Sequence, residues 1–316
     1  MTGLLALPRS IVQCNRFSMT QFTHAPYNSD KSPFSVGLAP LDPEAWLEVD
    51  ENLGAYLAEK ERLNESNEDA VFRAEAGTEE AQAEVLAMLL DYLPRQFADQ
   101  YAFDGETISV AVNGVRYRVS DWREAPLKLA AKLVQEDLVI MRKGDDGYRL
   151  AAAALHFPSS WSLAEKFGQA MPAIHTSVPG FNDGRMGNVV ARLFDNLTVD
   201  TPVWRLNWSI YGDGELHHPR AKSLDARVDD GSAHLHIRVE RQTLRRLPES
   251  GDILFTIRIH VDPIAAFAAH PEGAQLAASL HRQLLALDEA QLAYKGLVKE
   301  RDRIAAALAA LAGEKV

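Results

Sequence analysis

The chain has 316 residues, 47% hydrophobic and 24% charged, a composition typical of a globular protein with a sizeable core. Its net charge of −11 disfavours nucleic acid or an anionic membrane as a partner, and no run of about 18 apolar residues predicts a transmembrane helix. The one cysteine, Cys14, excludes an internal disulfide and a four-cysteine iron–sulfur cluster.

The N-terminal part of the chain predicts an irregular extension. The first 18 residues lack the basic start, long apolar stretch and cleavage site of a signal peptide, and Met19 is a candidate start of the natural chain. Residues 26–43 are rich in Pro, Ser, Asp and Asn, which is typical of a loop. We therefore expect an extension over residues 1–40, a single domain over residues 41–312, and a cytoplasmic location.

Two helices are predicted next. Asp42 and Pro43 suit the N-cap and first position of a helix that continues, with breaks, to residue 66. Residues 78–97 form a second helix capped by Thr78, because their apolar residues recur at helical spacing.

The middle of the chain predicts two hairpins with a helix between them. In residues 107–119, apolar residues alternate with small or polar ones, as in a strand. Asn113-Gly114 is the signal for a two-residue type I′ turn, in which both positions need φ > 0. A helix is expected over residues 125–138. The second hairpin covers residues 139–157 and turns at the Asp-Asp-Gly of residues 145–147.

Three long strands and a helical tail complete the pattern. The strands cover residues 203–212, 233–247 and 252–261, and residues 263–312 are helical. Hairpins imply antiparallel pairing, and strands and helices are grouped along the chain instead of alternating strictly. The sequence therefore predicts an α+β fold.

Common catalytic signatures are missing from the sequence. We find no Walker A loop, no G-x-G-x-x-G after a strand, no H-E-x-x-H and no G-x-S-x-G. P-loop enzymes, nucleotide-fold dehydrogenases, zincins and α/β-hydrolases are therefore disfavoured.

One of the ten histidines, His175, has a distinctive context. It follows a short helical segment that opens with a capping box, Ser162 to Glu165, and it precedes the turn Val178-Pro179-Gly180. A histidine held among apolar residues at a helix exit can be an axial haem ligand, and a satisfied core histidine has the same pattern. The residues alone leave both interpretations open.

Two of the predicted strands carry alternating basic and aromatic residues. Side chains alternate across a strand, so Arg205 faces away from Trp208, and Glu240 faces away from Arg241. Arginines on a sheet face can bind carboxylates, including cofactor propionates, and a Trp can pack on a flat cofactor. Cross-strand Arg–Glu pairs and ordinary core packing would explain the same residues.

Several segments together resemble the haem-dependent oxidative N-demethylase family. In chain order they are PFSVGLAPLD (33–42), LVQEDL (133–138), FPSSWSLAEKFGQAMPAIHTSVPG (157–180), RLNWS (205–209), ERQTLRRLP (240–248), LFTIRIHVDP (254–263) and YKGL (294–297). The resemblance implies a PAS-like antiparallel sheet of about five or more strands, with helices across one face and flanking N- and C-terminal helices.

The resemblance also implies a reaction. One haem b would support oxidative removal of a methyl group from a small methylated amine with dioxygen, releasing formaldehyde. Electrons would come from an external flavin and iron–sulfur reductase, because a chain with one cysteine does not hold such a relay itself. The alternatives are a haem-based PAS sensor of gas or redox state and a haem-free interaction protein of the same fold.

The same resemblance makes His175 the leading candidate for the iron ligand. His260 is the rival, because an aromatic residue is expected in its place, and His156 is a further alternative. Because a methylated amine is a cation near neutral pH, a carboxylate in the pocket is expected. The candidate catalytic carboxylates are Glu136, Asp137 and Glu240, and the candidate cofactor contacts are Arg205, Trp208 and Arg241.

Overall fold

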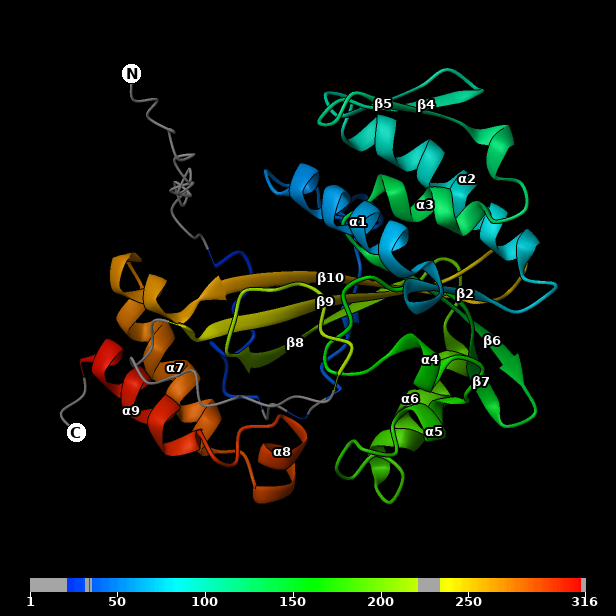
Figure 1. Ribbon diagram of the computed structural model, residues 1–316. Coiled ribbons are helices and arrows are strands. Elements are labelled where there is room, and N and C mark those ends of the chain that lie inside the picture. Colours follow the sequence, from blue (N-terminus) through cyan, green and yellow to red (C-terminus); the bar gives the residue numbers. More distant parts are fainter. Residues whose placement is uncertain (1–21, 32–33, 35, 221–233, 314–316) are drawn as a thin grey trace, which may run out of the picture.

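The computed structural model describes residues 22–31, 34, 36–220 and 234–313 (Figure 1). The candidate start at Met19 and the single cysteine, Cys14, lie outside the described residues. Within them, strands and helices form the predicted α+β fold.

A seven-stranded sheet lies at the centre, with strand order β1-β8-β9-β10-β6-β7-β2 and antiparallel pairing throughout. Its strands are β1 (Ala39–Pro40), β2 (Phe72–Ala74), β6 (Asp137–Gly144), β7 (Gly147–Ala154), β8 (Val203–Tyr211), β9 (His236–Arg246) and β10 (Ile253–Pro263). The second predicted hairpin and the three predicted long strands are thus confirmed, and the sheet agrees with a PAS-like fold.

The first predicted hairpin belongs to a separate small sheet, formed by β3 (Tyr101–Phe103), β4 (Thr107–Val110) and β5 (Val115–Arg118). Its predicted two-residue turn is wrong. Val110 pairs with Val115, so four residues connect the strands, and of the predicted pair only Gly114 has a positive φ, +68°. The amide of Gly114 donates to Ala111, and the Asn113 side chain accepts from Val115, so the wider turn satisfies its own polar groups.

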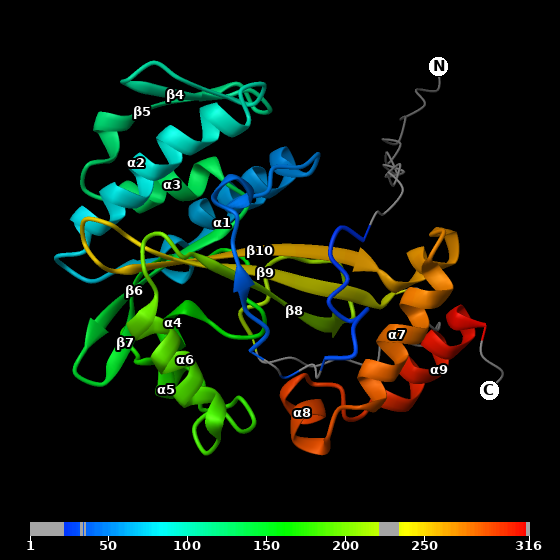
Figure 2. The same ribbon diagram turned by 180° about the vertical axis from the view of Figure 1, so that it is seen from behind.

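Helices cover both faces of the main sheet, instead of the one face that the resemblance implied (Figures 1 and 2). On one face lie α1 (Leu53–Val71), α2 (Glu79–Gln96) and α3 (Pro126–Leu133). Across the other lie α4 (Leu163–Lys166), α5 (Met171–Ile174) and α6 (Arg185–Asn196). The C-terminal helices α7 (Gly273–Leu285), α8 (Glu289–Tyr294) and α9 (Arg301–Ala312) gather near the far end of the long strands.

Among the described residues there are also three short 3₁₀ helices: η1 (Pro43–Ala45), η2 (Val119–Trp122) and η4 (Ile264–Ala269). The Asp42 side chain caps η1 as predicted. Thr78 does not cap α2 with its side chain: its hydroxyl donates to the carbonyl of Glu75, and its oxygen accepts from the side-chain amide of Gln82 instead of a backbone amide. None of the described helices is both long enough and apolar enough to span a bilayer.

The helix predicted over residues 125–138 ends at Leu133. A residue far away in sequence causes this end. The buried Lys60 of α1 donates to the carbonyls of Ala131, Val134 and Glu136, which satisfies the groups that a continuing helix would have bonded. The chain is thereby free to turn into β6.

The pairing of the long strands determines which of their polar and charged side chains lie on each face of the sheet. Leu206 pairs with Arg241, which pairs with Arg258, while Asn207 pairs with Glu240, which pairs with Ile259. We call the side with α4–α6 the cavity face; it carries Arg205, Asn207, Glu240, Gln242 and Ile257. The opposite face carries Trp208, Arg241, Thr256, Arg258 and His260.

Candidate functional site

A cavity of about 440 Å³ lies between the cavity face, helices α4–α6 and the end of α8. This volume is within the range of roughly 300–1,000 Å³ that is typical of small-molecule sites. Apolar side chains from β6, β7, α5 and α6 form much of its wall. Its charged or titratable lining includes His175, Arg205, Glu240 and Lys295.

His175 enters this cavity from the C-terminal end of α5. Its Nδ1 lies 2.9 Å from the carbonyl oxygen of Met171, and its ring stacks on Phe181 at 4.2 Å with 10° between the planes. A carbonyl oxygen only accepts, so Nδ1 carries the proton and Nε2 keeps its lone pair. Burial lowers the pKa of His175 and so favours the neutral ring, although the hydrogen bond that Nδ1 donates to Met171 opposes the shift.

Three charged residues share the adjoining wall. Arg205 lies on β8, Glu240 on the neighbouring β9, and Lys295 directly after α8. Burial lowers the pKa of Arg205, while the nearby Glu240 opposes the shift. Burial likewise lowers the pKa of Lys295 to about 8, and its Nζ donates to the carbonyl of Trp208 at 2.5 Å. The wall can therefore bind an anion through its cations and a cation through its carboxylate.

Glu240 keeps its place on this wall through a neighbour on its own strand. The amide of Gln242 donates to Glu240 Oε2 at 2.7 Å, and both side chains line the cavity. Of the three predicted carboxylates, Glu240 is the one that the structure places in the cavity.

Asp137 serves the backbone instead. Its two carboxylate oxygens accept from the amides of His156 and Phe157 at 2.7 and 3.0 Å, which joins the start of β6 to the chain leaving β7. Burial raises the pKa of Asp137 to about 6, although the charge of Lys60 opposes the shift. Asp137 is fully buried and does not line the cavity.

Glu136 is also fully buried outside the cavity. Its Oε1 accepts from the amide of Glu48 at 3.0 Å, and burial raises its pKa, although the charge of Arg258 opposes the shift. His156, the further iron-ligand alternative, is buried with its Nε2 3.0 Å from Asn64, and it borders a separate hollow of about 230 Å³ beside α1 and α3.

The opposite face holds the remaining predicted residues. Arg241 donates to the carbonyls of Ala45 and Trp46, and its Nε lies 3.2 Å from Glu48. Trp208 packs in an apolar cluster with α7 and α9. Of the three predicted cofactor contacts, only Arg205 therefore lines the cavity.

His260, the rival iron ligand, lies across the sheet from His175. Its Nε2 is 2.9 Å from Glu48, whose other oxygen is 2.7 Å from His24. Burial tends to raise the pKa of Glu48, but the hydrogen bonds with His24 and His260 and the charge of Arg241 outweigh it and hold that pKa well below its usual range. Burial lowers the pKa of His260.

Sequence reasoning gave no role to Lys295, Phe181, His24 or Glu48. Lys295 stands in the YKGL segment, one of those that carry the family resemblance. Nothing local in the sequence indicates that its side chain reaches the cavity. His24 and Glu48 lie in irregular segments, where no periodicity indicates which way a side chain points. Their proximity to His260 comes from long-range packing.

A family model described as haem-dependent oxidative N-demethylase, alpha subunit-like, matches residues 37–305. The match spans most of the chain, and the chain belongs to this family. The resemblance seen in the sequence is thereby confirmed, and the family's name indicates haem dependence and a multi-subunit enzyme.

The geometry of Asp137 predicts a role in stability. Asp137→Asn should lower the free energy of unfolding by about 2 kcal/mol, because an amide group cannot accept from both backbone amides. Urea unfolding with an unchanged m-value measures the loss. The control is Asp195→Asn, an exposed partner of Lys143, which should cost less than about 1 kcal/mol. Equal losses in the two variants would contradict the assignment.

Proposed function

We propose that this member of the family binds one haem b in the 440 Å³ cavity, with Nε2 of His175 as the axial ligand of the iron. The observation that carries the proposal is the hydrogen bond from Nδ1 to Met171, made by a ring that stacks on Phe181 at the cavity wall. Metal-ligating histidines commonly donate their second ring N–H to a carbonyl, which fixes the tautomer and the ring direction.

Arg205 and Lys295 would hold the haem propionates. Both are cationic groups whose pKa burial lowers, and both line the same cavity. A buried cation is costly unless a counter-charge offsets it, and a propionate is such a counter-charge. Arg241 and Trp208, on the opposite face, are not part of this binding site.

The reaction we propose is oxidative N-demethylation of a small methylated amine. Bound haem would supply the activation of dioxygen, which no side chain in the cavity provides. One oxygen atom would enter the N-methyl group, which then leaves as formaldehyde; the other would leave as water with two electrons and two protons from outside. Glu240, a carboxylate on the sheet wall of the cavity, would hold the ammonium group of the amine.

The electrons would come from a partner. The chain has one cysteine, too few for an iron–sulfur relay, and the alpha-subunit name of the family fits a complex with further subunits. We propose an external reductase carrying flavin and iron–sulfur centres, and a cytoplasmic location for the complex.

Replacing the proposed ligand gives the first test. His175→Ala should lose most of its haem while keeping its far-UV circular dichroism, because the iron loses its protein ligand. His260→Ala is the matched comparison and should keep an unchanged Soret band. The assignment is wrong if haem is lost from the His260 variant and kept by the His175 variant.

The two arginines give a second test. Arg205→Gln should weaken haem binding at least tenfold, because a hydrogen bond to a charged group contributes about 1.5–3 kcal/mol. Arg241→Gln should leave haem affinity unchanged and lower the free energy of unfolding, since its guanidinium binds Ala45, Trp46 and Glu48. Haem titration followed by absorbance measures the first effect, and an equal loss of affinity in both variants would contradict it.

Formaldehyde release tests the reaction itself. The haem-loaded chain, supplied with a reductase, should release formaldehyde from dimethylamine or a related amine. Glu240→Gln should raise KM for the amine at least tenfold, whereas Glu289→Gln, at the exposed start of α8, should not change it. Reducible haem without formaldehyde from any methylated amine would overturn the proposal and favour a sensor.

A further inference from the structure

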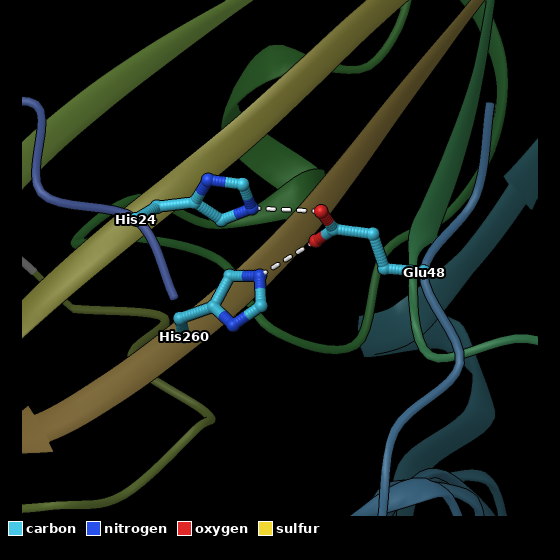
Figure 3. A group of neighbouring side chains, drawn as sticks. All are labelled: His24, Glu48 and His260. Atoms are coloured by element: carbon cyan, nitrogen blue, oxygen red, sulfur yellow. Dashed lines mark hydrogen bonds and ion pairs between the residues drawn. The ribbon is translucent and has the colours of Figure 1, made fainter. Parts of the chain in front are cut away.

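Two histidines and a carboxylate converge on the opposite face of the sheet (Figure 3). His24 comes from the N-terminal segment, Glu48 from the connection between η1 and α1, and His260 from β10. We call these three residues the His–Glu–His cluster. None of them lines the 440 Å³ cavity, so the cluster is separate from the proposed haem site.

The three side chains point their donor atoms at one place. Nε2 of His24 lies 2.7 Å from Oε1 of Glu48, and Nε2 of His260 lies 2.9 Å from Oε2. One ligand atom from each residue lies within 4.8 Å of the other two. Ligand atoms about 2.1 Å from a tetrahedral metal ion are about 3.4 Å apart, so an outward shift of roughly half an ångström would admit an ion.

Packing holds both rings in this orientation. The rings of His24 and His260 meet edge to face, with centroids 5.0 Å apart, and His24 also lies 6.3 Å from Trp204. Their side chains are only 15% and 12% exposed, against 25% for Glu48, so the cluster is shielded without being closed. A site of this kind is preorganised and can still be reached from solvent.

The charges around the cluster must also allow a cation to bind. The positive charge of Arg241, 3.2 Å from Glu48, opposes the binding of a metal ion. The terminal nitrogens of Arg241, however, donate to the carbonyls of Ala45 and Trp46. Asp262 follows two residues after His260 on the same side of β10 and interacts electrostatically with His24. This second carboxylate offsets Arg241.

A further ion pair borders the cluster. Arg258 lies 2.7 Å from Asp50, which neutralises its charge locally. Two carboxylates, Glu48 and Asp262, therefore stand against the single remaining charge of Arg241, and the surroundings of the two histidines keep a negative balance. That balance suits a divalent ion.

We propose that His24, Glu48 and His260 bind one divalent transition-metal ion of the kind typified by Zn²⁺. Two imidazoles and one carboxylate suit such ions better than Mg²⁺ or Ca²⁺, which prefer oxygen ligands only. Three protein ligands leave a position for water. Because the ligands come from three separate segments, the ion joins the N-terminal segment to the sheet and stabilises the folded chain.

The test uses the full chain after removal of metals with EDTA. Calorimetric titration with Zn²⁺ should show one tight site, which His260→Phe and Glu48→Gln each weaken at least tenfold. His281→Gln, on α7, is the control and should bind like the wild type. Zn²⁺ should raise the melting temperature of the wild type and the control but not of the two cluster variants.

A measurement on the wild-type chain tests the proposal even if the variants fail to fold. Zn²⁺ should protect His24 and His260 of the wild-type chain from acylation by diethyl pyrocarbonate, as measured by peptide mass spectrometry, and leave His281 labelled. No Zn²⁺ binding, equal binding in all variants, or unprotected His24 and His260 would each overturn the proposal. The Soret band of haem-loaded protein reports separately on the cavity, so failure here leaves the proposed function untouched.

Discussion

The register between β8, β9 and β10 determines which side chains share a face of the central sheet, and so where both candidate sites lie. Because side chains alternate along each strand, the pairing of Leu206 with Arg241 sends Arg205 and Glu240 to the cavity and Arg241 to the other side. A shift of the pairing by one residue would exchange the two sets of side chains. The cavity and the His–Glu–His cluster thus lie on opposite faces of these strands, and β10 supplies His260 to the cluster.

Two buried charged side chains position the segments that lead into and out of the hairpin of β6 and β7. Lys60 ends α3 by donating to three carbonyls, and Asp137 accepts two amides from the chain that leaves β7. Both groups are fully buried and close enough to influence each other's pKa. Asp137 thereby holds the start of the segment that leads from β7 to α4 and α5.

Features set by neighbours in sequence could be predicted, and features set by distant contacts could not. The capping box at Ser162 is local and was confirmed, as was the α+β class. The end of α3 depends on Lys60, some 70 residues earlier, which no local pattern reveals.

For the candidate site, too, local features could be predicted from the sequence and long-range contacts could not. Alternation within each strand was correct for Arg205 and for Arg241, but sequence does not show the register between strands, so both remained candidates for one cavity. His24 and Glu48 could not be associated with His260, because loops without periodicity bring them there. His175 could be singled out because the turn that follows it is local, although the capping box at Ser162 begins α4 and His175 ends the separate helix α5.

The position of the iron tests the central claim most directly. Crystals of the haem-loaded chain, measured at the iron absorption edge, would give an anomalous peak that marks the metal without reference to haem shape. We expect one strong peak in the cavity, at bonding distance from Nε2 of His175. A cavity without such a peak, with the haem iron beside His260 or His156 instead, would contradict the assignment.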